Sequence, residues 1–359
     1  MKKIYLLLAL LAFVATQSLA SLKPFFDKEE YLELLRINRS FGGTEMKDST
    51  PTPKYSTKIY RSPEVGLKNM WELWEYNGVP VISIRGTVAS PVSWGENFYA
   101  AMIPAQGTLH LENDFSFDYK FAENTNAKVH VGWAIGTAYL QRDILPKIDS
   151  LVQAGKKEFY ITGHSQGGAL SYLLRSYFYY LQQAGRLSAN LKFKTVTSAA
   201  PKPGNLPYAY DYETINFNGW SYSVVNALDW VPESPFSIQT IPDFTPTNPF
   251  SNADKVLKKQ KFLARVYGKY VYKSLDKSTR KAQKIFEKYL GNKVYSQLKK
   301  QFPELKEPVY EKSMAYVRVG YPIVLMPDEK YLSKKKEPSS NAFEHHSYWG
   351  YYQLTERMK

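Results

Sequence analysis

Short apolar or β-branched runs alternate along this chain with segments in which apolar residues recur at helical spacing. The runs predict strands, and the segments between them predict helices: strands over 80–84, 158–162, 193–197 and 222–225, and helices over 136–151 and 168–182. Strands that alternate with helices form a mostly parallel sheet with helices on both faces. The pattern therefore predicts an α/β fold, with a further late strand over 316–325.

The first twenty residues have the pattern of a signal peptide. Lys2 and Lys3 precede an apolar run over 4–14, and Ser18 and Ala20 are small residues at the positions that cleavage requires. The run is shorter than the roughly 20 apolar residues of a membrane-spanning helix. We expect residues 1–20 to direct export, so that the protein is secreted or periplasmic, and residues 21–359 to form a single domain. An uncleaved N-terminal anchor is the alternative.

Composition and charge narrow the function classes. With 44% hydrophobic residues and no cysteine, the chain is neither disordered nor dependent on disulfides or thiolate chemistry. A net charge of +14 suggests a polyanionic partner, but residues 251–300 hold 15 Lys+Arg against three acids. Apolar residues recur there at helical spacing up to Gly291, a predicted helix end, so an insertion over about 245–305 should form basic amphipathic helices. Those helices are either a solvated cap over the active site or a surface that docks on anionic lipid.

A nucleophile is predicted at Ser165. The strand over 158–162 runs into Gly163-His164-Ser165-Gln166-Gly167 and directly on into a helix, which is the context of a G-x-S-x-G elbow. The glycines permit the close approach of strand and helix, and the helix N-terminus directs backbone N–H groups at a developing oxyanion. A plain Gly-rich turn is the alternative.

The serine needs a base and an acid. Hydrolases with such an elbow have the chain order Ser, acid, His. Of the five histidines, only His345 and His346 follow Ser165 and fit that order. His164 should pack under the turn. Asp229, just past the strand over 222–225, is placed to orient an imidazole, unless it only caps the next turn.

Two donors are predicted for an oxyanion hole. One is the backbone N–H of Gln166, and the other is Thr87, which follows the first strand in Arg85-Gly86-Thr87. The alternative for Gly86-Thr87 is a turn that merely ends the strand.

Six motifs in a fixed order resemble those of class 3, fungal-type triacylglycerol lipases of the α/β-hydrolase fold. They are Arg85-Gly86-Thr87 with Trp94 after it, Val129-His130-Val131-Gly132-Trp133, Thr162 to Leu170, Ala200 to Asn205, Asp229-Trp230-Val231-Pro232, and Glu344 to Gly350. The last of these is similar to the family's Asp-His-Leu-Ser-Tyr-Phe-Gly ending, and this resemblance implies that His345 is the base, with His346 as the alternative. Gln166 replaces the usual leucine after the nucleophile.

The resemblance implies a serine esterase that hydrolyses carboxylic esters, acylglycerols first, through Ser165, Asp229 and His345. A phospholipase A1 or general carboxylesterase would use the same residues, and a non-catalytic exported lipid-binding protein is the alternative of another class. We expect no cofactor, no metal site and no nucleic-acid partner. The apolar residues between Thr87 and Val129, including Trp94, Phe98, Tyr99, Met102 and Ile103, form either a lid or ordinary core.

Overall fold

A seven-stranded sheet forms the centre of the protein. The computed structural model describes residues 21–42, 49–335 and 341–358, so the predicted signal peptide lies outside the described residues. The strand order is β1-β2-β3-β8-β9-β10-β11. The strands are β1 (Ser56–Arg61), β2 (Trp71–Tyr76), β3 (Val79–Ile84), β8 (Glu158–His164), β9 (Lys192–Ser198), β10 (Ser221–Asn226) and β11 (Tyr321–Leu325). The pairing is parallel among β3, β8, β9, β10 and β11, and β1 and β2 add an antiparallel edge.

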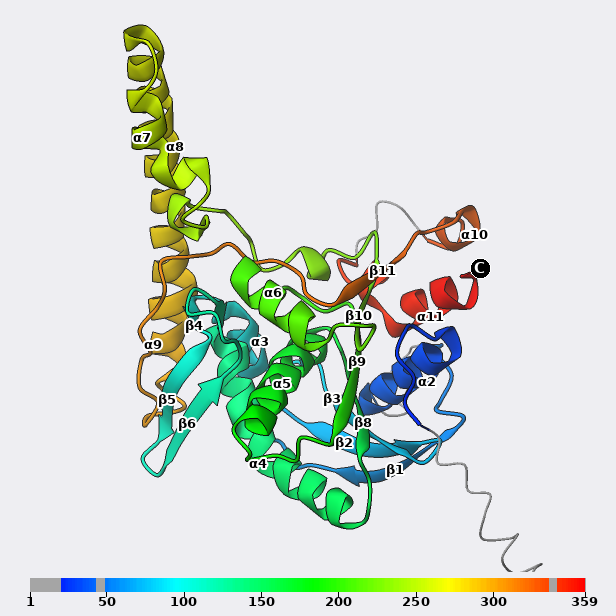
Figure 1. The fold of residues 1–359 in the computed structure, drawn as a ribbon. Coiled ribbons are helices and arrows are strands. Elements are labelled where there is room, and N and C mark those ends of the chain that lie inside the picture. Colours follow the sequence, from blue (N-terminus) through cyan, green and yellow to red (C-terminus); the bar gives the residue numbers. More distant parts are fainter. Residues whose placement is uncertain (1–20, 43–48, 336–340, 359) are drawn as a thin grey trace, which may run out of the picture.

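Helices cover both faces of the sheet (Figure 1). One face carries α4 (Val131–Gln153), α5 (Gln166–Gln183) and α6 (Leu206–Ile215), and the other carries α2 (Lys28–Arg39) and α11 (Tyr348–Glu356). Side chains alternate between the two faces: in β8, Phe159 and Ile161 join the core under α4 and α5, whereas Tyr160 joins the core under α2 and α11. The predicted α/β architecture is therefore confirmed. It could be predicted because a strand that is buried on both faces appears in the sequence as a continuous apolar run.

The predicted elements differ from the observed ones mainly at their ends. The four early strands and both helices are present, each extended by one to several residues. The late strand is shorter than predicted: β11 begins at Tyr321, because Gly320 before it has φ +79°, outside the extended region.

Smaller elements were not predicted. They are α3 (Pro91–Phe98), α10 (Glu329–Leu332), the short pair β4 (Met102–Pro104) and β7 (Lys128–His130), and the hairpin of β5 (Gln106–Glu112) and β6 (Phe115–Lys120). Five 3-10 turns complete the described chain: Ser40–Gly42, Val231–Glu233, Ile241–Asp243, Pro249–Asn252 and Glu344–His346.

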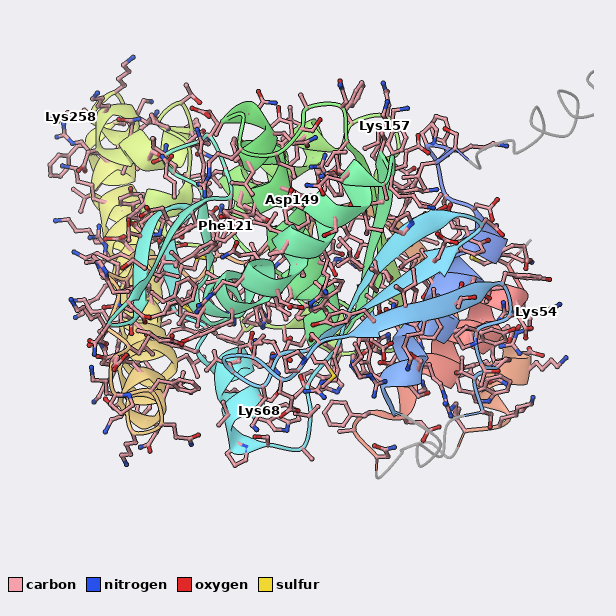
Figure 2. All side chains as sticks on the ribbon, turned by 90° about the horizontal axis from the view of Figure 1, so that it is seen from below. Lys54, Lys68, Phe121, Asp149, Lys157 and Lys258 are labelled. Carbon is pink, nitrogen blue, oxygen red and sulfur yellow. The ribbon has the colours of Figure 1, made fainter. Side chains whose placement is uncertain are left out.

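The insertion between Asp229 and the two candidate histidines is helical, as predicted. It contains α7 (Ala253–Lys258), α8 (Phe262–Glu287) and α9 (Val294–Leu298). In Figure 1, α7 and the first half of α8 stand clear of the rest of the molecule, and Figure 2 shows Lys258 at the opposite side from Lys54. We call residues 253–287 the arm and the described residues outside 251–300 the body.

The predicted helix end at Gly291 is wrong. The helix continues through Gly291 as a π-helical turn over Lys288–Lys293 and then as α9. A Cβ at Gly291 would lie 3.0 Å from the Cβ of Ala101, and the Ala101 N–H donates to the Leu290 carbonyl at 2.9 Å. The glycine therefore lets the base of the insertion pack closely on the body rather than capping a helix. Among the described residues, no helix combines the length and apolar character of a membrane span.

Candidate active site

Ser165 lies at a sharp turn between β8 and α5. Its backbone has φ +60° and ψ −131°, a region that non-glycine residues rarely occupy. The flanking glycines permit this turn: a Cβ at Gly163 would lie 2.3 Å from the backbone of Gly167, and a Cβ at Gly167 would lie 2.1 Å from the carbonyl oxygen of Ile84. The turn is thus held by backbone atoms that no side chain can displace, which fixes the direction of the serine.

The structure joins His346 to Asp229. The Nδ1 of His346 lies 2.8 Å from Oδ2 of Asp229, and both residues follow the carboxyl ends of the sheet strands near Ser165. Since an ionised carboxylate only accepts hydrogen bonds, Nδ1 carries the proton and Nε2 of the neutral ring is left with a lone pair. A ring in this tautomer can take a proton from a hydroxyl at Nε2.

His345, the preferred base from the sequence, takes another position. Its Nδ1 lies 2.9 Å from the hydroxyl of Tyr331, and the two rings are tilted against each other at a centroid distance of 5.7 Å. Both histidines belong to the 3-10 turn Glu344–His346, where successive side chains diverge by about 120°. Only one of them can therefore face Asp229, and in the structure it is His346, one residue after the preferred His345.

The loop that carries His346 is held from below by two side chains. The Nε2 of His164 donates to the His346 carbonyl at 2.8 Å, and the Asn226 amide donates to the His345 carbonyl at 3.0 Å. Burial, together with the neighbouring His346, lowers the pKa of His164 to about 3, so its ring is neutral near pH 7. His164 packs under the turn as expected and positions the histidine loop.

Asp229 is fully hydrogen-bonded. One oxygen accepts from the Val231 N–H at 3.0 Å and the other from His346 and from the Tyr351 hydroxyl at 2.7 Å. Burial alone would raise the pKa of Asp229, but these donors outweigh it and lower the pKa below its ordinary value. Asp229 therefore both caps the next turn and stays ionised to orient the imidazole.

A hydrogen-bond chain orients Thr87. The indole Nε1 of Trp133 can only donate, and it lies 3.1 Å from Oδ1 of Asn97. The other end of that amide, Nδ2, then faces Oγ1 of Thr87 at 2.8 Å and donates to it. Because the Thr87 oxygen accepts from Asn97, its own proton is directed elsewhere and remains available for an oxyanion.

His130, the last residue of β7 and the N-cap of α4, supports this chain. Its ring stacks on Trp133 at 3.7 Å, and its Nε2 lies 3.1 Å from the Asn97 carbonyl. That carbonyl can only accept, so Nε2 carries the proton, and Nδ1 accepts from the Trp133 N–H at 3.3 Å. Burial lowers the pKa of His130 to about 3, and the ring is neutral near pH 7.

The predicted oxyanion donors lie beside the elbow. A Cβ at Gly86 would be 3.0 Å from the His164 carbonyl oxygen and 3.5 Å from the Ser165 Cβ, so the strand end 85–87 passes directly against the nucleophile. Gln166 is the first residue of α5, where backbone N–H groups have no partner within the helix. Its side chain is buried and donates to the Ser93 carbonyl at 3.4 Å.

One cavity of about 740 Å³ collects these groups. Thr87, Ser165, Gln166 and His346 all line it, whereas Asp229 lies behind His346 and does not. Its other walls are mainly apolar and come from six parts of the chain: Trp94, Phe98, Ala100, Trp133, Pro201, Trp230, Val231, Pro235, Phe236, Leu290, Phe343 and Tyr348. The cavity therefore offers a polar reacting end and an apolar space suited to a hydrocarbon chain.

The residues of the segment predicted as lid or core fall into two groups. Trp94 and Phe98 lie on α3, line the cavity and stack on each other at 5.9 Å, whereas Tyr99, Met102 and Ile103 are fully buried in the body. A further wall residue, Leu290, comes from the base of the insertion. Sequence reasoning missed Leu290, Asn97 and Tyr351, because their roles depend on contacts between elements distant in sequence; the Trp133 of the 129–133 motif was the one available signal.

Comparison with known proteins supports the motif assignment. A family model described as Lipase (class 3) matches residues 81–239. This range contains five of the six motifs and ends before the sixth, Glu344 to Gly350, which is where the register of the histidine differed. A search of curated proteins found no match.

Several solved structures are similar to part of the chain. A lipase from Rhizopus microsporus var. chinensis is 19% identical over 62% of this chain and 75% of its own, with a TM-score of 0.42. A triacylglyceride lipase from Rhizomucor miehei is 17% identical over 59% and 77%, also with a TM-score of 0.42. The Lip2 lipase from Yarrowia lipolytica is 19% identical over 60% and 78%, with a TM-score of 0.43.

Proposed function

We propose that this protein is a serine esterase that hydrolyses acylglycerols, because a family model described as Lipase (class 3) matches residues 81–239. The observation that carries the proposal is that Ser165 and His346 line one cavity, with Asp229 hydrogen-bonded to the far side of the imidazole. Nucleophile, base and orienting carboxylate come from three separate loops, and such an arrangement activates a hydroxyl that is otherwise a poor nucleophile.

In the proposed reaction, Oγ of Ser165 attacks the ester carbonyl carbon while its proton passes to Nε2 of His346. The negative oxygen of the tetrahedral intermediate accepts hydrogen bonds from the Gln166 N–H and from Thr87. The intermediate collapses, the alcohol leaves with the proton from His346, and an acyl group remains on Ser165. A water molecule activated by the same imidazole then releases the fatty acid and restores the serine.

The substrate class follows from the cavity walls. Apolar side chains dominate the lining, and the exposed aromatic residues Phe98, Trp230 and Phe236 belong to the same cavity. This chemistry favours an acyl chain over a charged or sugar substrate. Phospholipids and short esters would present the same ester carbonyl to Ser165, so activity measurements decide between these substrate classes.

Ser165→Ala tests the proposal. We expect the variant to lose at least about a thousandfold in kcat on p-nitrophenyl esters and acylglycerols, while Ser150→Ala, an exposed serine outside the cavity, keeps the wild-type rate. Undiminished hydrolysis by Ser165→Ala would contradict the assignment. A panel of acylglycerols, phospholipids and short esters separates lipase, phospholipase A1 and carboxylesterase. Lipid binding without hydrolysis of any of them would favour the non-catalytic alternative.

We also propose export with cleavage after Ala20. The Ser21 hydroxyl donates to Glu158 at 3.1 Å and the Leu22 N–H donates to the same carboxylate at 2.7 Å. An α-ammonium group created at Ser21 would therefore lie close to a negative charge, which stabilises the cleaved form. Sequencing of the mature N-terminus from the exported protein checks this; a chain that still begins at Met1 would contradict it.

The partner that we propose for the basic helices 251–300 is an anionic lipid surface. Residues outside 1–20 and 251–300 contain 30 basic and 30 acidic residues, so the excess positive charge of the mature protein is confined to the insertion. An anionic surface would therefore attract this one part of the molecule.

A further inference from the structure

The distal half of the arm carries an exposed apolar stripe. Leu263, Val266, Tyr267 and Tyr270 stand at positions i, i+3, i+4 and i+7 of α8, and their exposed fractions are 80%, 53%, 71% and 70%. This spacing places the four side chains on one face of the helix. Large apolar side chains grouped in this way on a surface mark an interaction site more often than isolated ones do.

The stripe points away from α7. Leu257 of α7 packs over Gly268, where a Cβ would lie 2.6 Å from its Cδ2, and the Tyr272 hydroxyl donates to the Phe250 carbonyl at 2.7 Å. Gly268 is five residues after Leu263, about 140° around the helix at 100° per residue. The neighbouring helix thus covers the face opposite the stripe.

Positive charge surrounds and continues the stripe. The arm contains 11 Lys+Arg and three acids, of which Asp276 already pairs with Arg280 at 2.8 Å. Lys273, Lys277 and Lys281 are exposed and follow Tyr270 on the same side of α8 at intervals of three or four residues. An apolar stripe edged by lysines matches a surface that is apolar within and negative at its border.

The stripe has a second part near the body. Ile285 is 22 residues after Leu263, about six helical turns, so it lies on the same face, and both Ile285 and Tyr289 are about half exposed. Leu290, the next residue, lines the reaction cavity. The apolar face of the arm therefore runs from its tip to the cavity wall, interrupted by the three lysines.

We propose that the arm lies flat on an anionic lipid surface, with Leu263, Val266, Tyr267 and Tyr270 inserted between the lipids and Lys273, Lys277 and Lys281 bound to their headgroups. This inference rests on the proposed function, and it deepens it by assigning the contact to one face of one helix. Tyrosine places an apolar ring and a polar hydroxyl at such a boundary, and lysine buries its methylenes while its ammonium stays among the headgroups. In this position the base of the arm brings the cavity to the lipid surface.

Flotation with vesicles tests the contact separately from the chemistry. The probes are vesicles of phosphatidylcholine alone and of phosphatidylcholine with a third of phosphatidylglycerol, at low and high salt. The Ser165→Ala protein is used for binding, so that the measurement does not depend on hydrolysis. We expect binding to the anionic vesicles to exceed binding to the neutral ones by at least about tenfold and to weaken at high salt.

Two sets of variants, each with a matched control, locate the surface. The stripe set is Leu263→Ser, Tyr267→Ser and Tyr270→Ser together, and its control removes equally exposed apolar side chains from the body, Phe217→Ser, Val309→Ser and Met326→Ser. The charge set is Lys273→Glu, Lys277→Glu and Lys281→Glu. Its control reverses the charge at three exposed lysines of the body, with Lys23→Glu, Lys54→Glu and Lys157→Glu. We expect each arm set to lower anionic-vesicle binding at least about tenfold and each control to lower it much less.

Hydrolysis completes the test. In the protein with Ser165 intact, the arm sets should keep the wild-type rate on soluble short esters and lose rate on lipid in anionic vesicles. Equal binding to neutral and anionic vesicles would overturn the inference, as would arm variants that bind like their controls. Concentration-dependent dimerisation that the stripe set abolishes, without vesicle binding, would instead make the stripe a contact between two copies of this chain. Failure of ester hydrolysis in the wild type would count against the proposed function and leave the binding result standing.

Discussion

The body and the arm use the same residue types in opposite ways. In the body, Tyr172, Tyr208 and Tyr212 are at most 1% exposed, and each hydroxyl has a hydrogen-bond partner, Thr197, Ser176 and Ser221 respectively. In the arm, Tyr267 and Tyr270 are 71% and 70% exposed. A buried hydroxyl must be paired, whereas an exposed one is satisfied by water. The body's tyrosines therefore specify a packed interior, and those of the arm leave a face to which something else can bind.

The charges follow the same division. The body has ion pairs that are buried at one or both ends, such as Lys194 with Glu30 at 2.6 Å. The arm has more than three times as many basic as acidic residues, and no core of its own beyond the contact between α7 and α8. Repulsion between so many like charges is weakest where solvent and its ions surround them. This is consistent with an arm that extends from the body instead of folding onto it.

The largest expected effect separates two adjacent histidines of the body. His346→Ala should lower kcat on a soluble ester by about a thousandfold or more, since it removes the proton acceptor beside Asp229. His345→Ala should lower it by less than about tenfold, since that ring contacts Tyr331 and does not line the cavity. Steady-state kinetics on short esters, with circular dichroism to check folding, gives both values. The reverse order of effects would restore the register in which His345 is the base.

Two glycines distinguish rigid packing in the body from adjustable packing in the arm. In Gly167→Ala the new Cβ would lie 2.1 Å from a backbone oxygen, so the free energy of unfolding should fall by about 3 kcal/mol or more. In Gly268→Ala the nearest atom is the end of the Leu257 side chain, which can rotate, and alanine favours a helix by about 0.5–1 kcal/mol. Urea unfolding should therefore show a large loss for the first variant and little change for the second. Equal losses would mean that the arm is packed as rigidly as the elbow.

Acid sensitivity should belong to the body, because both buried neutral histidines lie there. Burial lowers the pKa values of His130 and His164 to about 3, whereas an unfolded histidine has a pKa of about 6.5. Between these values the unfolded chain binds more protons, so stability is present above about pH 6.5 and falls as the pH falls, by about 1.4 kcal/mol per pH unit for each histidine.

Thermal unfolding across pH 5 to 8, a range below and above the ordinary histidine pKa of about 6.5, measures this slope. His130→Asn should be less stable than the wild type near neutral pH but show a smaller slope, because one of the two titrating groups is removed. An unchanged slope in His130→Asn would show that this ring is already protonated or solvated in the folded protein. His110→Asn, at an exposed position, serves as the control.

The smallest expected effect lies where arm and body meet. Leu290→Ala enlarges the cavity and should shift the ratio of kcat/KM values toward longer acyl chains by several-fold to about tenfold, while Leu290→Phe should shift it toward shorter ones. Tyr289→Ala, whose side chain is exposed beside it, is the matched control and should leave the ratio unchanged. The ratio is read from a series of p-nitrophenyl esters. Parallel changes in both Leu290 variants would show that acyl chains occupy another wall.

The parts that sequence reasoning reached share one property: their signal is local. The strand over 158–162, the elbow at 163–167 and the helix after it are one continuous segment, and a buried parallel strand is recognised by its own residues. The hairpin of β5 and β6 was missed although its signal is also local: apolar and polar residues alternate in both strands, and only Asn113-Asp114 separates them. The segment was interpreted as lid or core instead.

The choice between His345 and His346 could not be local. Both have the same side chain, the same turn and adjacent positions, and their difference arises only from which ring meets Asp229, 117 residues away from His346. The orientation of Thr87 through Asn97 and Trp133 is of the same kind, since it depends on a donor-only indole brought to the amide by packing of α3 on α4. The continuation of the helix past Gly291 was decided by its contact with Ala101.

The sequence by itself determined the α/β alternation, the elbow that holds Ser165, the placement of Asp229 after a strand and the concentration of positive charge in residues 251–300, because each depends on neighbouring residues along the chain. The tertiary structure decided which histidine faces Asp229, how the Thr87 hydroxyl is oriented and which face of the arm is left uncovered. Each of these is a question of direction, and a side chain's direction is set by the elements that pack around it.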